Sequence, residues 1–322
     1  MIVASSPLRI SLAGGSTDLD DFVQENGHGS VISFASNLRT YISLHADVLG
    51  INRLKNNYVI NYSEREEEPN LKDIKNDVAR VVLEYFSCGP VCCSFTSDVF
   101  SSGSGLASSS SYLVSFIKAV SVHQNIRLSD FEVCKLALEL EKQFNPLTGQ
   151  QDPYGCGIGS LKKFTFYSDA GPTVNYLSQD LFNKLDMYLL FTDIRRSSTA
   201  VLKEVKKKGI TDRLPLLTIV NDTEQSIIKA DKLSFYECIK EGWDIKKRTS
   251  PMVVANPDLV ELDLLLATDP SVKAHRLCGA GNGGFFLLFA EKGDKLGKNI
   301  TSLKKPLIKV KISEDGVRGV GL

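Results

Sequence analysis

The sequence lacks an excess of charge of either sign. Its 322 residues include 38 lysines and arginines and 38 aspartates and glutamates, so no basic surface is expected that would bind nucleic acid or membrane. No apolar run approaches the ~18 residues of a membrane span, and the N-terminus lacks the basic start and apolar core of a signal peptide. We therefore expect a cytoplasmic protein that binds neither nucleic acid nor membrane.

Several familiar site patterns are also missing. The seven cysteines include no C-x-x-C pair, and their one cluster, Cys88-x3-Cys92-Cys93, lies on an apolar run, which favours core thiols in a reducing compartment. The four histidines form no i, i+4 pair, so histidine ligation of a metal is not supported. No G-x-S-x-G elbow and no Walker A Gly-Lys-Ser/Thr occurs, which leaves a Ser/His/Asp hydrolase without support.

The order of expected helices and strands indicates an α+β protein. β-Branched and aromatic enrichment predicts strands at 2–3, 8–13, 30–34, 39–46, 58–62, 94–99, 162–168, 186–192, 285–290 and 308–312. Helical periodicity or caps predict helices at 71–85, from 113, from 129, at 214–248 as a pair, and from 256. The irregular mixture does not fit a doubly wound sheet. We place a domain boundary at 180/181, giving domains 1–180 and 181–322.

The charged segment 63–69, Ser-Glu-Arg-Glu-Glu-Glu-Pro, is interpreted as a solvated loop.

The most informative segment is 101–111, Ser-Ser-Gly-Ser-Gly-Leu-Ala-Ser-Ser-Ser-Ser, which we call the serine loop. Its glycines expose backbone N–H groups, and the helix that follows adds the positive end of its dipole, an arrangement that suits a phosphate. A Gly/Ser run also resembles a flexible linker. The strand before it and the amphipathic helix after it favour binding.

Glu141 and Asp152 form the acidic pair of interest. Glu141 lies near the end of a capped helix, and Asp152 lies in Gly-Gln-Gln-Asp-Pro-Tyr-Gly, a turn-rich segment just before a strand. One carboxylate could hold Mg²⁺ while the other accepts a hydroxyl proton. The alternative is a solvated glutamate and an aspartate that caps a backbone N–H.

Two further segments could line a site. In 7–18, Arg9 is a cation in an apolar strand, which is costly unless paired, and Asp18 follows a Gly-Gly turn; the alternatives are a strand-edge arginine and an Asx-turn. Segment 276–284, Arg-Leu-Cys-Gly-Ala-Gly-Asn-Gly-Gly, either lets the backbone approach a ligand or packs tightly beside the serine loop.

Together, 7–18, the serine loop and 276–284 resemble the three motifs of the GHMP kinase superfamily, in the same order. The Gln-Asp-Pro-Tyr-Gly turn, the 190–197 strand and Trp243-Asp-Ile-Lys-Lys247 are most similar to D-glycero-D-manno-heptose 7-phosphate kinases. The resemblance implies an N-terminal domain like ribosomal protein S5 domain 2 and a ferredoxin-like C-terminal domain. It also implies transfer of a phosphoryl group from ATP, with Mg²⁺, to a sugar or sugar phosphate.

The resemblance assigns roles residue by residue. It makes Asp152 and Arg9 catalytic and Ser109 and Glu141 the Mg²⁺ ligands. It implies that ATP contacts Ser102, Gly103, Ser104, Gly105, Leu106, Ala107, Ser108, Ser109 and Ser110. It implies that the acceptor contacts Gly15, Ser16, Thr17, Asp18, Asp152 and Gly281. The basic residues available for an acceptor phosphate are Arg195, Arg196, Lys246, Lys247 and Arg248, of which we choose Arg195 and Lys247; the alternative for each is a charge on the surface.

The chain departs from the family pattern at three positions. Phe100 replaces a frequent proline, Arg276 replaces the usual lysine, and Ala107 replaces a glycine. A methyl group at position 107 is compatible with the loop if that residue is already helical. A galactokinase-like or fucokinase-like enzyme and a non-catalytic sugar sensor remain alternatives, and the protein is expected to be a monomer or homodimer.

Overall fold

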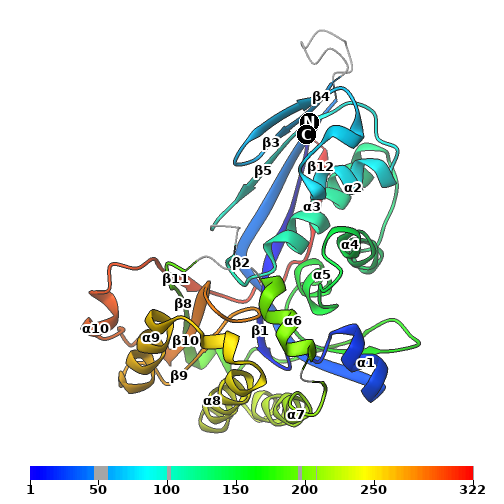
Figure 1. Cartoon of the computed structure of the whole chain (residues 1–322). Coiled ribbons are helices and arrows are strands. Elements are labelled where there is room, and N and C mark those ends of the chain that lie inside the picture. The colour runs from blue at the N-terminus through cyan, green and yellow to red at the C-terminus, as the bar shows by residue number, and fades with distance from the viewer. Residues whose placement is uncertain (47–56, 100–102, 195–197, 208, 322) are drawn as a thin grey trace.

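The computed structural model describes residues 1–46, 57–99, 103–194, 198–207 and 209–321. These residues form two β-sheets, each covered by its own helices (Figure 1). Within them, no helix is both long enough and apolar enough to cross a lipid bilayer.

The first sheet has eight strands and begins with the two longest, β1 (Ile2–Ala13) and β2 (His28–His45). Its order is β12-β1-β2-β5-β3-β4, and β6 pairs with both β2 and β7. The remaining strands are β3 (Tyr58–Asn61), β4 (Arg65–Glu68), β5 (Cys92–Ser97), β6 (Leu161–Tyr167), β7 (Thr173–Tyr176) and β12 (Arg318–Gly321).

Four helices gather on one face of this sheet (Figure 1). They are α2 (Asp77–Tyr85), α3 (Ser108–His123), α4 (Asp130–Phe144) and α5 (Gln151–Gly157). Helix α1 (Asp20–Asn26) contacts β2, which begins two residues after it. Helix α3 is the centre of this layer because it packs against β1, β2, α2, α4 and α5. The serine loop is thereby fixed at the point where α3 meets β1.

The second sheet has four strands in the order β11-β8-β10-β9. They are β8 (Leu185–Phe191), β9 (Ala274–Leu277), β10 (Phe285–Glu291) and β11 (Leu307–Val310). The helices of this half are α6 (Ser198–Lys207), α7 (Pro215–Ile228), α8 (Lys232–Thr249), α9 (Pro257–Thr268) and α10 (Lys298–Thr301), with 3-10 turns η2 (Phe182–Lys184) and η3 (Pro251–Val254). One continuous apolar cluster joins Leu8 of β1 to Phe285 of β10, so the two halves share a core.

The chain changes sheets between β7 and β8, where the proposed boundary at 180/181 falls. The last strand does not stay in the second half, because β12 returns to pair antiparallel with β1. The two chain ends therefore lie together (Figure 1). The division into 1–180 and 181–322 remains a proposal, with β12 as the segment that crosses it.

Two of the predicted helix starts are confirmed. Ser129 and Glu132 form a reciprocal capping box at α4, and Asn256 caps α9 with Pro257 in its first turn. Both caps provide acceptors for backbone N–H groups that the first turn of a helix otherwise leaves without partners. The helix expected over 71–85 is divided into η1 (Leu71–Asp73) and α2.

The prediction of a solvated loop at 63–69 is wrong. Residues 65–68 form β4, and Glu66 is only 6% exposed. Its carboxylate accepts hydrogen bonds from the backbone N–H groups of Lys75 at 2.6 Å and Asn76 at 3.0 Å and from the Tyr62 hydroxyl at 2.7 Å. These donors replace the hydration that a buried carboxylate loses.

Candidate active site

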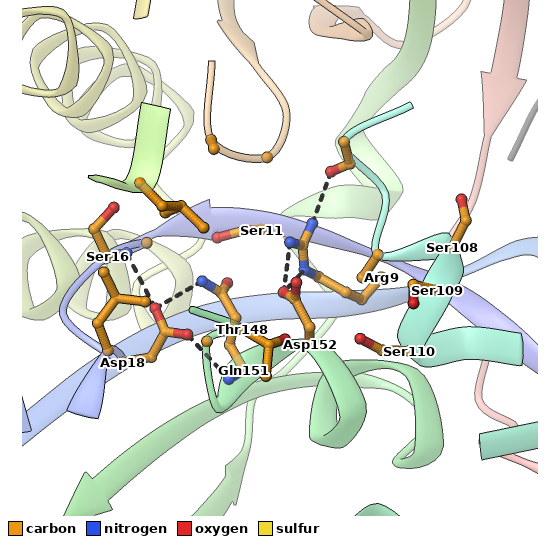
Figure 2. Close-up of a pocket in the computed structure, with 18 of the residues that line it drawn as sticks. Arg9, Ser11, Ser16, Asp18, Ser108, Ser109, Ser110, Thr148, Gln151 and Asp152 are labelled. Carbon is orange, nitrogen blue, oxygen red and sulfur yellow. Dashed lines mark hydrogen bonds and ion pairs between the residues drawn. The ribbon is translucent and has the colours of Figure 1, made fainter. Parts of the chain in front are cut away.

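A cavity of about 320 Å³ opens where the serine loop, β1, α5 and the second half of the chain meet. Figure 2 shows Arg9 and Asp152 in its centre, with Asp18 on one side and Ser108, Ser109 and Ser110 on the other. It is lined by Arg9, Ser11, Gly15, Ser16, Asp18, Leu19, Gly103, Ser104, Gly105, Ala107, Ser108, Ser109, Ser110, Glu141, Asn145, Thr148, Gly149, Gln151, Asp152, Leu202, Lys246, Arg276, Gly279 and Ala280.

The serine loop forms one wall of the cavity. Gly103 and Gly105 have φ values of 70° and 80°, a region in which glycine is not strained. The Ser104 side chain bonds the Ser108 hydroxyl at 2.9 Å and accepts from the Leu106 N–H at 3.2 Å. Helix α3 then begins at Ser108 with no side-chain cap, so its first-turn amides suit an anion.

Ala107 is not helical, so the condition under which the sequence made its methyl group compatible with the loop is not met. It precedes α3 with φ 59° and ψ 43°, in the left-handed region. This conformation costs an alanine about 1–2 kcal/mol relative to the right-handed one. The glycine of the family pattern at this position therefore has a conformational reason, and the methyl group of this chain is accommodated under strain.

Arg9 connects the serine loop to Asp152. Its Nε and Nη2 donate to Asp152 Oδ1 at 2.9 and 2.6 Å, and its Nη1 donates to the Gly105 carbonyl at 2.9 Å. Burial is the largest single effect and would lower the pKa of Arg9, but the charge and hydrogen bonds of Asp152, with smaller contributions from Cys156 and Cys278, together raise it. Asp152 Oδ2 accepts no hydrogen bond from a described residue, and the side chain is 25% exposed. A carboxylate oxygen is thus held at the cavity with its acceptor capacity free.

Asp152 does not lie in a turn before a strand, as the sequence suggested. It lies in the first turn of α5, and Pro153 follows it. Proline is tolerated in the first turn because the N–H it lacks would have no partner inside the helix. Asp152 therefore projects from the N-terminal end of a short helix.

Glu141 lies deep beside the start of α3. It is 2% exposed, and Ser110 Oγ donates to its Oε2 at 2.5 Å. Burial raises the pKa of Glu141 to about 7, the Ser110 hydrogen bond opposes this, and the Asp152 charge adds to it. Ser109, the other residue implied as a metal ligand, lines the same cavity.

Asp18 forms the opposite end of the cavity. It is 1% exposed and accepts from the Ser16 N–H at 3.0 Å, the Gln151 N–H at 3.1 Å and Gln151 Nε2 at 2.8 Å. Burial, and then the Asp152 charge, raise the pKa of Asp18 to about 6. Gly149 lies directly against this carboxylate, with no room for a methyl group.

The second half of the chain closes the cavity with cations. Arg276 of β9 is 4% exposed and donates Nη1 to the Leu12 carbonyl, and Lys246 of α8 donates to the Gly279 carbonyl. Burial, together with the Arg9 charge, lowers the pKa of Arg276 to about 10, although Cys278 partly opposes this. This wall therefore adds positive charge to the cavity.

Segment 276–284 packs beside the serine loop, which was one of its two predicted roles. The Phe285 N–H donates to the Ser104 carbonyl at 3.2 Å. Gly284 has φ 92°, and a Cβ there would lie 2.4 Å from the Ser104 oxygen. Gly279 and Ala280 reach the cavity itself.

Four of the sequence-predicted contacts do not line the cavity. Lys247 pairs with Asp244 at 2.9 Å and Asp263 at 3.1 Å. Gly281 faces Val253 instead, and a Cβ there would lie 2.8 Å from the Val253 Cα.

The other two, Thr17 and Leu106, are core residues. The Thr17 hydroxyl donates to the Gly14 and Ser30 carbonyls, both at 2.8 Å, and Leu106 is fully buried. Ser102 and Arg195 lie outside the described residues.

The cavity also contains residues that the sequence reasoning missed. These are Ser11, Thr148 and Gln151. Lys246 lines the cavity as well, and the sequence offered it only as one of several basic residues available for the acceptor phosphate. Ser11 Oγ and Gln151 Oε1 are buried without a hydrogen-bond partner in the described structure, which is typical of groups that await a polar ligand. For Lys246, the signal was the buried stripe of α8, which includes Ile239 and Gly242 at helical spacing.

Comparisons with known proteins find a family match and two similar kinases. Residues 73–160 match the family described as the GHMP kinases N terminal domain. D-glycero-alpha-D-manno-heptose 7-phosphate kinase of Campylobacter jejuni is 28% identical over 316 residues, 91% of each chain. Galactokinase of Thermococcus kodakarensis is 25% identical over 233 residues, 62% of this chain and 66% of that one.

A solved structure supports the same fold. The crystal structure of a D-glycero-D-manno-heptose 1-phosphate kinase from Bacteriodes thetaiotaomicron has a TM-score of 0.80 at 20% identity, over 100% of this chain and 99% of that one. The matched segment 73–160 contains the serine loop, Glu141 and Asp152. Residues 73–160 therefore match the N-terminal domain of the GHMP kinases, and the chain as a whole has the α+β fold of these kinases.

Proposed function

We propose that the protein is a sugar kinase that transfers the γ-phosphoryl group of ATP to a hydroxyl of a sugar or sugar phosphate. The observation that carries this proposal is the Arg9–Asp152 pair. Arg9 bonds the serine loop through Gly105 and bonds Asp152 through two nitrogens, so the donor end and the acceptor end of the cavity are joined by one side chain.

The serine loop fits the polyphosphate of ATP. Phosphoryl transfer depends on positioning and on neutralising charge, and the α3 N-terminus with the glycine-rich backbone supplies donors for phosphate oxygens. The residues proposed to contact ATP are Gly103, Ser104, Gly105, Ala107, Ser108, Ser109 and Ser110, all of which line the cavity.

The donor set also fits Mg²⁺. This ion prefers oxygen ligands and is commonly held by one or two carboxylates together with substrate phosphates. Glu141 and Ser109 would hold it here, and no cluster of three or more acidic, histidine or cysteine ligands exists in the described chain. When bound, the ion would neutralise charge on the phosphate oxygens.

Asp152 would orient the acceptor hydroxyl and accept its proton through Oδ2. Arg9 fixes the rotamer of this carboxylate, because both of its contacts fall on Oδ1. Asp18 would accept hydrogen bonds from other hydroxyls of the acceptor, with Gly15 and Ser16 beside it. A sugar offers several hydroxyls, so a second carboxylate at this end suits it.

The best candidate acceptor is D-glycero-D-manno-heptose 7-phosphate, phosphorylated at C1. The support is the Campylobacter relative, which matches over 91% of both chains. The phosphate of such an acceptor would find Lys246 and Arg276 on the second-half wall, in place of the Lys247 expected from the sequence.

A screen of ADP release tests this function. The protein is supplied with ATP, Mg²⁺ and, in turn, heptose 7-phosphate, galactose, fucose, mevalonate and homoserine. We expect turnover with the heptose phosphate above all. Turnover on galactose or fucose alone would show a sugar kinase with a different acceptor from the one proposed. No ADP release with any acceptor would favour a sugar sensor on the same fold.

A further inference from the structure

Helix α5 carries Asp152 but has only seven residues, too few to hold its own position. The last carbonyls of a helix have no partner inside it and must be satisfied from elsewhere when they are buried. At the end of α5 these partners come from other elements, and one side chain bonds two of the four carbonyls of residues 155–158.

Lys162 of β6 lies under the C-terminal end of α5. Its ammonium donates to the carbonyls of Gly155 at 3.1 Å, Ser160 at 3.3 Å, and Ile158. The side chain is fully buried. All three donors of the ammonium are therefore used on the backbone at and just after the end of α5.

Two weaker contacts complete this end of the helix. Ser6 Oγ of β1 donates to the Cys156 carbonyl at 3.0 Å, and the Val317 N–H donates to the Gly157 carbonyl at 2.9 Å. The carbonyls of residues 155–158 are thus each held by a group outside α5. Lys162 is the only charged group among them.

The burial of Lys162 is costly in itself. The groups that affect its titration are Cys156 and Cys134, and no carboxylate of the described chain acts on it. Burial lowers the pKa of Lys162 to about 7. A buried ammonium without a counter-ion is unfavourable unless its hydrogen bonds offset the lost hydration. The hydrogen bonds to these carbonyls therefore explain why a lysine is buried at this position.

The carbonyl that Lys162 holds belongs to the residue against which Arg9 packs. A Cβ on Gly155 would lie 3.0 Å from Arg9 Cβ and 3.1 Å from its Cγ. Asp152 is one turn earlier on the same helix face. A shift of α5 at Gly155 would therefore move Asp152 relative to the Arg9 guanidinium.

We propose that Lys162 is a positioning residue for phosphoryl transfer: by anchoring the C-terminal end of α5, it sets the placement of Asp152 against Arg9 and the acceptor hydroxyl. The proposal rests on the proposed kinase function. It assigns Lys162 no contact with ATP or acceptor, since it does not line the cavity.

A double-mutant cycle on the full-length protein tests this role. Lys162→Met, Asp152→Asn and the double variant are assayed with ATP and the acceptor that the screen identifies. We expect Lys162→Met to lower kcat by about 10–100-fold, because a displacement of about 1 Å can cost that much. The KM for ATP should stay within about twofold, and Lys162→Met should have almost no effect when Asp152 is already asparagine.

A role in general stability predicts a different pattern. Lys162→Met would then lower kcat by the same factor in both backgrounds, which would overturn the proposal, as would an unchanged kcat. Lys163→Met is the matched control, since Lys163 is the next residue of β6 and pairs with Glu224 instead; it should behave as wild type.

A milder variant keeps the test available if Lys162→Met does not fold. Ser6→Ala removes only the hydrogen bond to the Cys156 carbonyl and should lower kcat by a few-fold, again only when Asp152 is present. An equal loss in the Asp152→Asn background would count against the proposal. A wild-type protein that releases no ADP on any acceptor would instead refute the proposed function.

Discussion

Replacing Gly149 by alanine adds one methyl group against the Asp18 carboxylate. The new Cβ would lie 2.1 Å from Asp18 Oδ2 and 3.1 Å from its Cγ. Gly149 is not in the left-handed region, so the substitution adds no backbone strain there. The perturbation therefore acts through one contact, on one carboxylate.

The magnitude follows from the hydrogen bonds that Asp18 must give up. To make room, the carboxylate has to leave at least one of its donors, the Ser16 N–H or the Gln151 N–H and Nε2. A hydrogen bond to a charged group contributes about 1.5–3 kcal/mol. Because 1.4 kcal/mol corresponds to a factor of ten, a carboxylate displaced from the acceptor by one such bond should raise the acceptor KM by about 10–100-fold.

Steady-state kinetics with each substrate varied in turn measures this effect. The KM for ATP should remain within about twofold, because the atoms nearest to the new methyl group are those of the Asp18 carboxylate. Gly89→Ala is the matched control, since a Cβ there meets nothing within 4 Å. An acceptor KM for a folded Gly149→Ala protein equal to that of Gly89→Ala would refute the placement of Asp18 against the acceptor.

Three further predictions follow from the same site. Asp18 has a pKa raised by burial from 3.8 to about 6, so the native state binds more protons than the unfolded state between these values, and the free energy of unfolding falls as pH rises through this window. Denaturant titrations should show this fall, of at most about 3 kcal/mol at 1.36 kcal/mol per pKa unit, in wild type relative to Asp18→Asn; parallel curves would contradict it. Ala107→Gly should raise the free energy of unfolding by about 0.5–1 kcal/mol, because relief of the left-handed alanine exceeds the entropy cost of glycine; a lower value in urea titrations would count against it. Lys246→Met should raise the acceptor KM about tenfold or more while Lys247→Met leaves it unchanged, and the reverse result would restore the expectation from the sequence.

The sequence predicted which segments come together at the cavity better than it predicted the orientation of single side chains. Residues 7–18, the serine loop and Asp152 converge on one cavity because their glycine turns and strand ends are local features with local signals. Lys246 and Lys247 show the limit. They are neighbours in sequence, and only the helical phase of α8 places one at the cavity and the other beside Trp243 and Asp263.

Buried charge was the other limit of the sequence. Glu66 stands in a run of acidic residues, which is typical of a solvated loop. Its side chain is nevertheless buried and accepts hydrogen bonds from the backbone N–H groups of Lys75 and Asn76, just before α2. Lys162 is likewise a buried charge that the sequence does not reveal, because it bonds a backbone carbonyl of another element, α5. Tertiary hydrogen bonds of this kind leave no period or motif in the sequence.

The most direct test of the account is the turnover of Asp152→Asn on the acceptor that the wild-type protein phosphorylates. Asparagine keeps the shape of the side chain and removes its charge, so nucleotide should bind within about threefold of wild type, as a titration with ATP would measure. We predict a loss of kcat of about 10²–10⁴-fold, the range for a positioned acid–base group, with the exposed Asp169→Asn as control. A kcat within about threefold of wild type would contradict the account.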